Sequence, residues 1–263
     1  MALDPGFLLL LAALCGFAFV AGFVDSVVGG GGLIQVPALF VMLPQMEPVT
    51  LLGTNKFVSV WGTTAAALQY SRRVAIEWRA TLPTIAAALL CGFLGASAAA
   101  HIPTDWFRPL MLALLVVVLV YTLWKKDLGA LHAPRLSRTH TFWFGLFTGA
   151  VIGFYDGFLG PGTGSFLIFA FVGLFGFSFI KASASAKFVN VATNLAALAY
   201  FITHGDVRYE LAVPMAVFNV AGSLLGARMA MRRGSGFVRA LFIVIVTILI
   251  ARYAWDIAHV HAH

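Results

Sequence analysis

Long apolar segments separated by short charged connections constrain this sequence more than any other feature. A helix needs about 20 apolar residues to cross the hydrocarbon core of a bilayer. The stretches that approach or reach this length are Phe7–Val24, Val58–Tyr70, Thr81–Ala100, Pro109–Leu123, Thr141–Tyr155, Phe188–Thr203, Leu211–Ala227 and Phe237–Ala251. They do not alternate between apolar and polar positions as the strands of a transmembrane barrel do. The sequence therefore predicts an all-α polytopic membrane protein in a lipid bilayer.

The amount and placement of charge support this fold class. Charged residues make up 10% of the chain, whereas soluble domains carry roughly 25%, so a water-soluble fold is excluded. The net charge of +7 comes from basic residues in the short connections, and these do not form the basic stripe of a nucleic-acid-binding surface. We therefore expect no nucleic-acid partner, and we use the basic residues as markers of membrane topology.

The chain also contains an internal repeat, at an offset of 131 residues, as from Gly22 to Gly153. The pairs in this register include Asp25 with Asp156, Gly29 with Gly160, Gly31 with Gly162, Lys56 with Lys187, Pro83 with Pro214, Gly95 with Gly226, Arg108 with Arg239 and Trp124 with Trp255. A single register that aligns so many positions indicates a tandem duplication. We assign residues 1–124 to the first repeat, 125–140 to a basic cytoplasmic linker and 141–263 to the second repeat.

Each repeat has the same predicted organisation, a glycine-broken helical hairpin followed by three transmembrane helices. The first apolar helix of each repeat ends at a glycine-rich break, Gly29–Gly32 or Gly160–Gly164. The apolar segments that follow, Leu33–Leu43 and Phe166–Phe175, are too short to span a bilayer of about 30 Å. We expect them to be half-helices or re-entrant arms.

Basic residues predict how the two repeats face, because cytoplasmic loops collect Lys and Arg. Three basic clusters are expected inside: Arg72, Arg73 and Arg79; Lys125, Lys126, Arg135 and Arg138; and Arg228, Arg232, Arg233 and Arg239. This distribution requires an odd number of crossings per repeat, so the two tandem repeats have inverted topology and both termini lie outside. Four spans per repeat in parallel orientation would instead place the cluster from Arg228 to Arg239 outside.

Four ionisable residues lie within apolar surroundings: Asp25, Asp156, Lys56 and Lys187. A charge at the centre of a membrane costs about 2.5 to 3.5 kcal/mol on insertion scales, so such residues are paired, face water or have a function. One interpretation is structural, with each Asp capping a helix end and each Lys neutralising one Asp. The other is functional, because the duplication preserves all four and inverted repeats would bring them together at one centre.

The glycine-rich breaks suit an anion. A helix that begins after Gly31 or Gly162 presents unpaired N–H groups and about half a positive charge at its N-terminus. Gly31, Gly32, Gly162 and Thr163 are therefore candidate substrate contacts, although glycine clusters in membrane helices also serve close packing. Neither break has the GK[ST] ending of a nucleotide-binding loop.

Polar side chains follow both lysines at helical spacing. Ser59 in the first repeat corresponds to Asn190 in the second, and Thr63 corresponds to Asn194. With Asn55, Lys56 and Lys187, these residues form a polar stripe that suits binding of an oxyanion, although hydrogen bonding between helices would also explain them.

The sequence resembles the TauE/SafE sulfite exporter family, also called the 4-toluene sulfonate uptake permease family, and specifically its YfcA-like branch. The resemblance rests on GFVDSVVGGGGLI at Gly22–Ile34 with Pro37, GTNKF at Gly53–Phe57, GFYDGFLGPGTGSF at Gly153–Phe166 and ASAK at Ala184–Lys187. It covers nearly the whole chain. The resemblance implies a multi-pass permease of the bacterial inner membrane that carries sulfite, sulfoacetate or other sulfonates, coupled to a proton or sodium ion.

These features predict a secondary transporter of small sulfur-containing anions that works by alternating access. The predicted substrate contacts are Lys56, Lys187 and the glycine-break amides, while Asp25 and Asp156 take the coupling proton or pair with the lysines. No enzymatic activity, catalytic residue, cofactor or metal is expected. The alternatives are a passive anion channel, a structural subunit and an intramembrane aspartyl protease, the last suggested by two membrane aspartates but weakened by the absence of a GxGD sequence.

Overall fold

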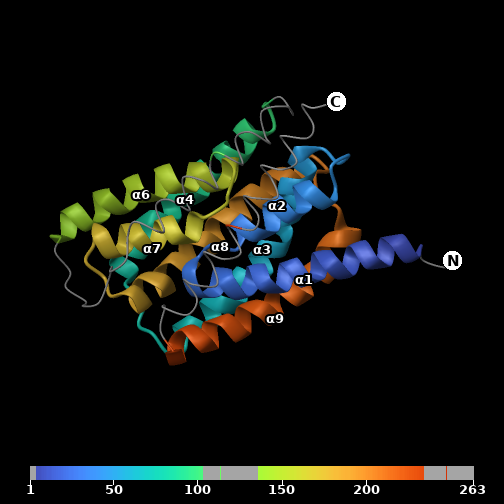
Figure 1. The fold of residues 1–263 in the computed structure, drawn as a ribbon. Helices are drawn as coiled ribbons and strands as arrows, with labels where there is room; N and C mark the ends of the chain where they lie inside the picture. Colours follow the sequence, from blue (N-terminus) through green and yellow to red (C-terminus); the bar gives the residue numbers. More distant parts are fainter. Residues whose placement is uncertain (1–3, 103–112, 114–135, 234–246, 248–263) are drawn as a thin grey trace.

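The computed structural model describes residues 4–102, 113, 136–233 and 247, and within them the secondary structure is helical, with no strand. The helices are α1 (Pro5–Val28), α2 (Gly32–Met42), α3 (Pro48–Ser71), α4 (Trp78–Ala99), α6 (Arg138–Phe158), α7 (Thr163–Gly173), α8 (Phe179–Thr203) and α9 (Tyr209–Arg233). Figure 1 shows them packed as one bundle of long helices, with the short α2 and α7 within it. The predicted helical class is thus confirmed for this part of the chain.

Helix bounds recur at the offset found in the sequence. The short helices α2 and α7 begin at Gly32 and Thr163 and are both 11 residues long. Proline lies at the first position of α3, whereas α8 begins at Phe179 after Ser178. The helix α6 begins at Arg138, with the Ser137 side chain accepting a hydrogen bond from the His140 N–H, so it starts inside the segment predicted as linker.

Glycines bring the first helix of each half against the last described helix of the other. A Cβ added to Gly149, Gly153 or Gly157 of α6 would overlap α4 at Thr84, Ala88 and Gly92 respectively. Likewise, Gly222 and Gly226 of α9 lie against Phe19 and Phe23 of α1. Because residue numbers increase together in both pairs, α6 runs parallel to α4 and α9 runs parallel to α1, as Figure 1 shows.

The central helices carry the polar residues, and the outer surface is apolar. Among the described residues, three helices are long and apolar enough to cross a membrane by composition: α1, α4 and α9 through Arg232. The equally long α3 and α8 contain the buried polar stripe, including Asn55, Lys56, Lys187 and Asn194. Leu9, Leu90 and Phe147 are more than half exposed on the outside, as expected for side chains that face lipid. Two predicted spans, Pro109–Leu123 and Phe237–Ala251, lie outside the described residues except for one residue in each, 113 and 247.

Candidate functional site

Both glycine breaks depend on backbone conformations that favour glycine. Gly29, which follows α1, has φ +78°, and its N–H donates to the Asp25 carbonyl. In the second half, Gly160 and Gly162 have φ +87° and +84°. Positive φ strains residues that have a Cβ. The chain therefore leaves α1 and α6 abruptly and starts α2 and α7 inside the bundle.

The two breaks lie directly against each other. A Cβ on Gly29 would overlap the backbone of Gly164, and a Cβ on Gly164 would overlap Gly29. The Ser165 N–H donates to the Gly29 carbonyl at 3.0 Å, and the Ser165 hydroxyl donates to the Val28 carbonyl at 2.7 Å. The start of α7 therefore satisfies carbonyls at the end of α1, which fixes one half against the other.

Lys56 of α3 forms a buried ion pair with Asp156 of α6. Its Nζ lies 2.9 Å from Asp156 Oδ2, and both side chains are at most 3% exposed. The Lys56 ammonium also donates to Asn194 Oδ1 of α8 at 3.3 Å. The Thr163 hydroxyl donates to Asp156 Oδ1 at 2.6 Å, so the carboxylate is held from two sides. Two charges at this depth are stable only with such partners.

Lys187 of α8 forms the corresponding pair with Asp25 of α1. Its Nζ lies 2.8 Å from Asp25 Oδ2 and also donates to the Asp25 carbonyl. The Thr63 hydroxyl and the Gly31 N–H each donate to this carboxylate at 3.4 Å. Each aspartate therefore contacts a residue of its own glycine break and the lysine of the other half.

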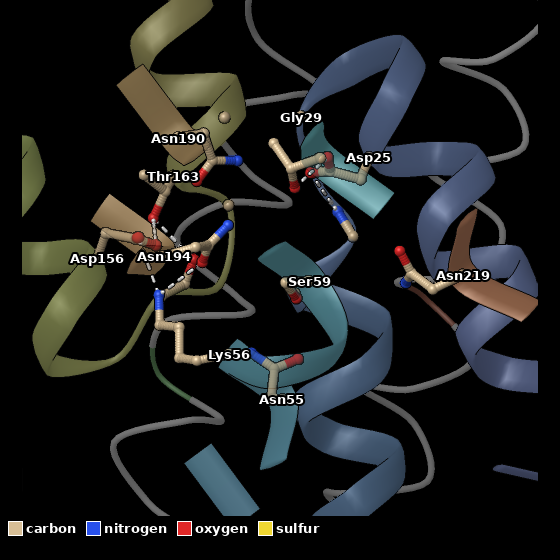
Figure 2. A pocket seen from close by; sticks show the side chains of 16 residues that line it. Asp25, Gly29, Asn55, Lys56, Ser59, Asp156, Thr163, Asn190, Asn194 and Asn219 are labelled. Carbon is tan, nitrogen blue, oxygen red and sulfur yellow. Dashed lines mark hydrogen bonds and ion pairs between the residues drawn. The ribbon is translucent and has the colours of Figure 1, made fainter. Parts of the chain in front are cut away.

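A small cavity lies beside the two ion pairs and is lined by Lys56, Asp156 and Asp25. Its volume is about 20 Å³, which is room for about one water molecule. Figure 2 shows Asp156, Asn194 and Lys56 on one side of it and Asn219 on the other. The lining residues are Asp25, Gly29, Gly31, Gly32, Asn55, Lys56, Ser59, Thr63, Asp156, Gly160, Gly162, Thr163, Gly164, Asn190, Asn194 and Asn219.

The structure brings all the candidate substrate contacts except one to this cavity. The exception is Lys187, whose ammonium reaches Asp25 and which does not line the cavity. Lys56 is therefore the lysine that faces the cavity in this conformation. The break amides are also less available than expected, since the Gly31 and Ser165 N–H groups already donate to Asp25 and Gly29.

Some polar groups at the cavity are unused. Asn55 is 3% exposed, and its Oδ1 has no hydrogen-bond partner among the described residues. An unsatisfied buried carbonyl oxygen costs about 1 to 3 kcal/mol, so Asn55 Oδ1 is available to accept a hydrogen bond from a donor group on a ligand. Asn219 was not among the predicted site residues, because it corresponds to Ala88 in the other half and the repeat gives no signal for it. Its one signal is a lone amide within the apolar run of α9.

Apolar outer surfaces, interrupted helices and a buried, ion-paired cavity between the two halves define a polytopic helical membrane protein with an internal polar site. The TauE/SafE sulfite exporter family model matches residues 14–253. The chain belongs to this family.

Curated relatives agree with this assignment. The chain is 36% identical over 250 residues to a probable membrane transporter protein, ORF9, of Sinorhizobium sp., covering 95% of this chain and 94% of that protein. It is 35% identical over 247 residues to a probable membrane transporter protein of Haemophilus influenzae, covering 94% and 95%. It is 34% identical over 248 residues to the probable membrane transporter protein YfcA of Escherichia coli K12, covering 94% and 91%. No solved structure matches. The protein is a membrane transporter and not an enzyme.

Proposed function

We propose that the protein is a secondary transporter of small sulfur-containing oxyanions, such as sulfite or organosulfonates, in the bacterial inner membrane. The substrate binds between two inverted repeats, and access alternates between the two sides of the membrane. The observation that carries this proposal is the presence of two ion pairs, Lys56 with Asp156, which is buried, and Lys187 with Asp25, which is partly buried, each of which joins the two halves beside one cavity.

The helix directions support the inverted arrangement. Figure 1 shows α1 and its counterpart α6 running in opposite directions across the bundle. The parallel packing of α1 with α9 and of α6 with α4 fits two equivalent units that exchange contacts around one centre. Inverted repeats, interrupted helices and a site at their interface are a recurring plan of secondary transporters.

The chemistry of the cavity supports an oxyanion as substrate. The Lys56 ammonium, the Ser59 hydroxyl and the side-chain amides of Asn55, Asn190 and Asn194 all line it. These groups supply charge-assisted and neutral hydrogen-bond donors, the combination that stabilises a small anion with several oxygens. The two lysines and two aspartates sum to no net charge, so a bound anion needs a compensating positive charge.

The small volume supports a carrier mechanism. A cavity of about 20 Å³ has no room for an oxyanion with three oxygens, so binding requires the halves to move apart around the ion pairs. A proton on Asp156 would release Lys56 for the anion and would also supply the compensating charge. The same reasoning applies to Asp25 and Lys187. A passive anion channel would instead need a continuous water-filled path beside these residues.

Transport in reconstituted vesicles tests the proposal. We expect purified protein to move sulfite or a sulfonate, with a rate that depends on a proton or sodium gradient. Lys56→Ala and Lys187→Ala should each abolish this flux. Arg208→Ala is the matched control, because the Arg208 guanidinium forms an ion pair with Glu210 on the exposed surface. Flux that persists in both lysine variants would contradict the assigned roles, and flux that ignores both gradients would favour a channel.

A further inference from the structure

Asn219 gives one end of the cavity a polar group that the other end does not have. It lies in the middle of α9, is 4% exposed and lines the cavity. Figure 2 shows it on the opposite side of the cavity from Lys56 and Asp156. A buried amide in an apolar membrane helix is costly unless it has partners or a ligand.

The hydrogen bonds of Asn219 fix which of its atoms is free. Its Nδ2 donates to the Ala18 carbonyl of α1 and to Gln35 Oε1 of α2, both at 3.0 Å. Because a backbone carbonyl can only accept, the nitrogen must face Ala18, and the amide cannot be turned around. Both of its hydrogens are then used. Its Oδ1 lies against Gly62 of α3 and accepts no hydrogen bond from any described residue, so the unused hydrogen-bonding group of Asn219 is an acceptor.

Gln35 holds Asn219 in this orientation. The Gln35 side chain is 1% exposed, and its Oε1 accepts from Asn219 while its Nε2 has no partner within the described residues. A buried amide donor left unpaired is unfavourable. The hydrogen bond that the described residues give the Gln35 side chain is therefore the one that orients Asn219.

Comparison of the two halves shows that the pair of amide side chains, Asn219 and Gln35, occurs at one end of the cavity only. The positions that correspond to Asn219 and Gln35 in the other half are Ala88 and Phe166, which have no polar side chain. The lysines and aspartates, in contrast, occur in both halves. The lysines and aspartates that both halves share therefore suit the oxyanion head group, which every substrate of this class has. Asn219 suits a group found at one end of a particular substrate.

We infer that the substrate has two different ends, an oxyanion head group held at Lys56 and a hydrogen-bond donor, a hydroxyl or amino group, bound by Asn219 Oδ1. Asn219 is then a specificity-determining residue and Gln35 is its positioning residue. This inference rests on the proposed function, because it assumes that the head group binds at Lys56. It selects hydroxyalkyl- or aminoalkylsulfonates over sulfite and plain alkylsulfonates.

Two sulfonates of the same size test the inference in the wild-type protein. In 2-hydroxyethanesulfonate a hydroxyl replaces the terminal methyl group of propane-1-sulfonate, and the head groups are identical. Ligands that bind the folded state raise the melting temperature, so thermal shift titration gives both affinities. We expect 2-hydroxyethanesulfonate to bind about tenfold more tightly, since sites built around a hydrogen bond reject analogues that lack the group. Equal affinities would overturn the inference alone, whereas no binding of either sulfonate would overturn the proposed anion site as well.

Two variants assign the preference to residues. Asn219→Ala introduces the residue found at Ala88 and should remove the preference while propane-1-sulfonate still binds. Gln35→Leu should reduce the preference without weakening propane-1-sulfonate, whereas a merely structural defect would weaken both ligands equally. If Asn219→Ala does not fold, Gln35→Leu provides the decisive comparison, because in Gln35→Leu the Ala18 carbonyl still accepts a hydrogen bond from Asn219. A preference that survives intact in the folded variants would contradict the assignment.

Discussion

The Lys56 ammonium lies 2.9 Å from the Asp156 carboxylate, which belongs to the other half of the chain. In the second ion pair, the ammonium of Lys187, in the second half, lies 2.8 Å from the carboxylate of Asp25, in the first half. Neither half therefore neutralises its own aspartate. Separation of the halves would leave four charges without partners, three of them buried, which costs several kcal/mol per buried ion unless water or a ligand replaces the partner. The ion pairs thus couple closure of the halves to the charge state of the cavity.

Removal of one carboxylate should strengthen anion binding and stop turnover. In Asp156→Asn, Lys56 loses its charged partner, and the cavity changes from neutral to a net positive charge of one. We expect a sulfonate to bind about tenfold more tightly, a gain of about 1.4 kcal/mol, while flux in vesicles falls to background because Lys56 no longer releases the anion. Thermal shift titration and flux measurements check the two effects.

The control for this variant is Glu210→Gln, which removes a carboxylate from the exposed pair with Arg208. Surface pairs contribute about 0 to 1 kcal/mol, so neither affinity nor flux should change noticeably. Weaker anion binding in Asp156→Asn, with the control unchanged, would mean that Asp156 organises the site and does not compete with the anion.

Glycines at the contact between the breaks should be far less replaceable than other glycines. Gly29→Ala combines a positive φ with overlap against Gly164, so we expect destabilisation of several kcal/mol or no folded protein. Gly173→Ala in α7 and Gly16→Ala in α1 are the controls, because a Cβ at either position meets nothing within 4 Å. Both should be neutral or stabilising by about 0.5 to 1 kcal/mol, since alanine favours a helix.

Gly205→Ala separates backbone strain from overlap. Gly205 has φ +78° like Gly29, but a Cβ there enters open space. This variant should lose about 1 kcal/mol from strain alone. Melting temperatures of the four purified variants give the order Gly16 and Gly173, then Gly205, then Gly29. A Gly29→Ala protein as stable as Gly205→Ala would show that the breaks do not pack as described.

Asp206, in the connection between α8 and α9, should make stability depend on pH. Burial and the nearby charge of Glu47 raise the pKa of its carboxyl above 3.8, while His204 lowers it in part. A raised pKa in the folded state means that the folded protein binds this proton more tightly than the unfolded chain. The ionisation of Asp206 therefore destabilises the fold as pH rises through and above 3.8. Asp206→Asn should gain stability over wild type toward neutral pH and not at acidic pH, as measured by melting temperature against pH.

Local features of the fold could be predicted from the sequence. The lengths of the apolar segments predicted the long helices. The glycine runs predicted the breaks that precede α2 and α7 to within a few residues. Both succeed because they depend on the conformational preferences of neighbouring residues in the chain. The helix α6 begins at Arg138, three residues before the apolar stretch that starts at Thr141, since Ser137 caps the helix within a polar segment. The orientation of the repeats depends on loop charges and on the membrane, and it stays a prediction.

The charged residues of the site could be predicted from the sequence, but the pairing between them could not. The duplication identified Asp25, Asp156, Lys56 and Lys187, and the structure groups them around one centre. The crossed pairing of each lysine with the aspartate of the other half arises from packing between halves, which no local pattern encodes. For the same reason, Lys187 was expected at the cavity, and the amide of Asn219, which has no counterpart in the first half, was overlooked.

The inverted arrangement makes a final prediction about two residues that correspond in the repeat, Arg73 after α3 and His204 after α8. Both side chains are exposed, so each can be replaced by cysteine after the native Cys15 and Cys91 are changed to alanine. In inverted repeats these positions lie on opposite sides of the membrane, and the basic cluster around Arg73 predicts that its side is cytoplasmic. In intact spheroplasts, a membrane-impermeant thiol reagent should label His204→Cys and should label Arg73→Cys only after permeabilisation. Labelling of both from the same side would show that the two repeats are parallel.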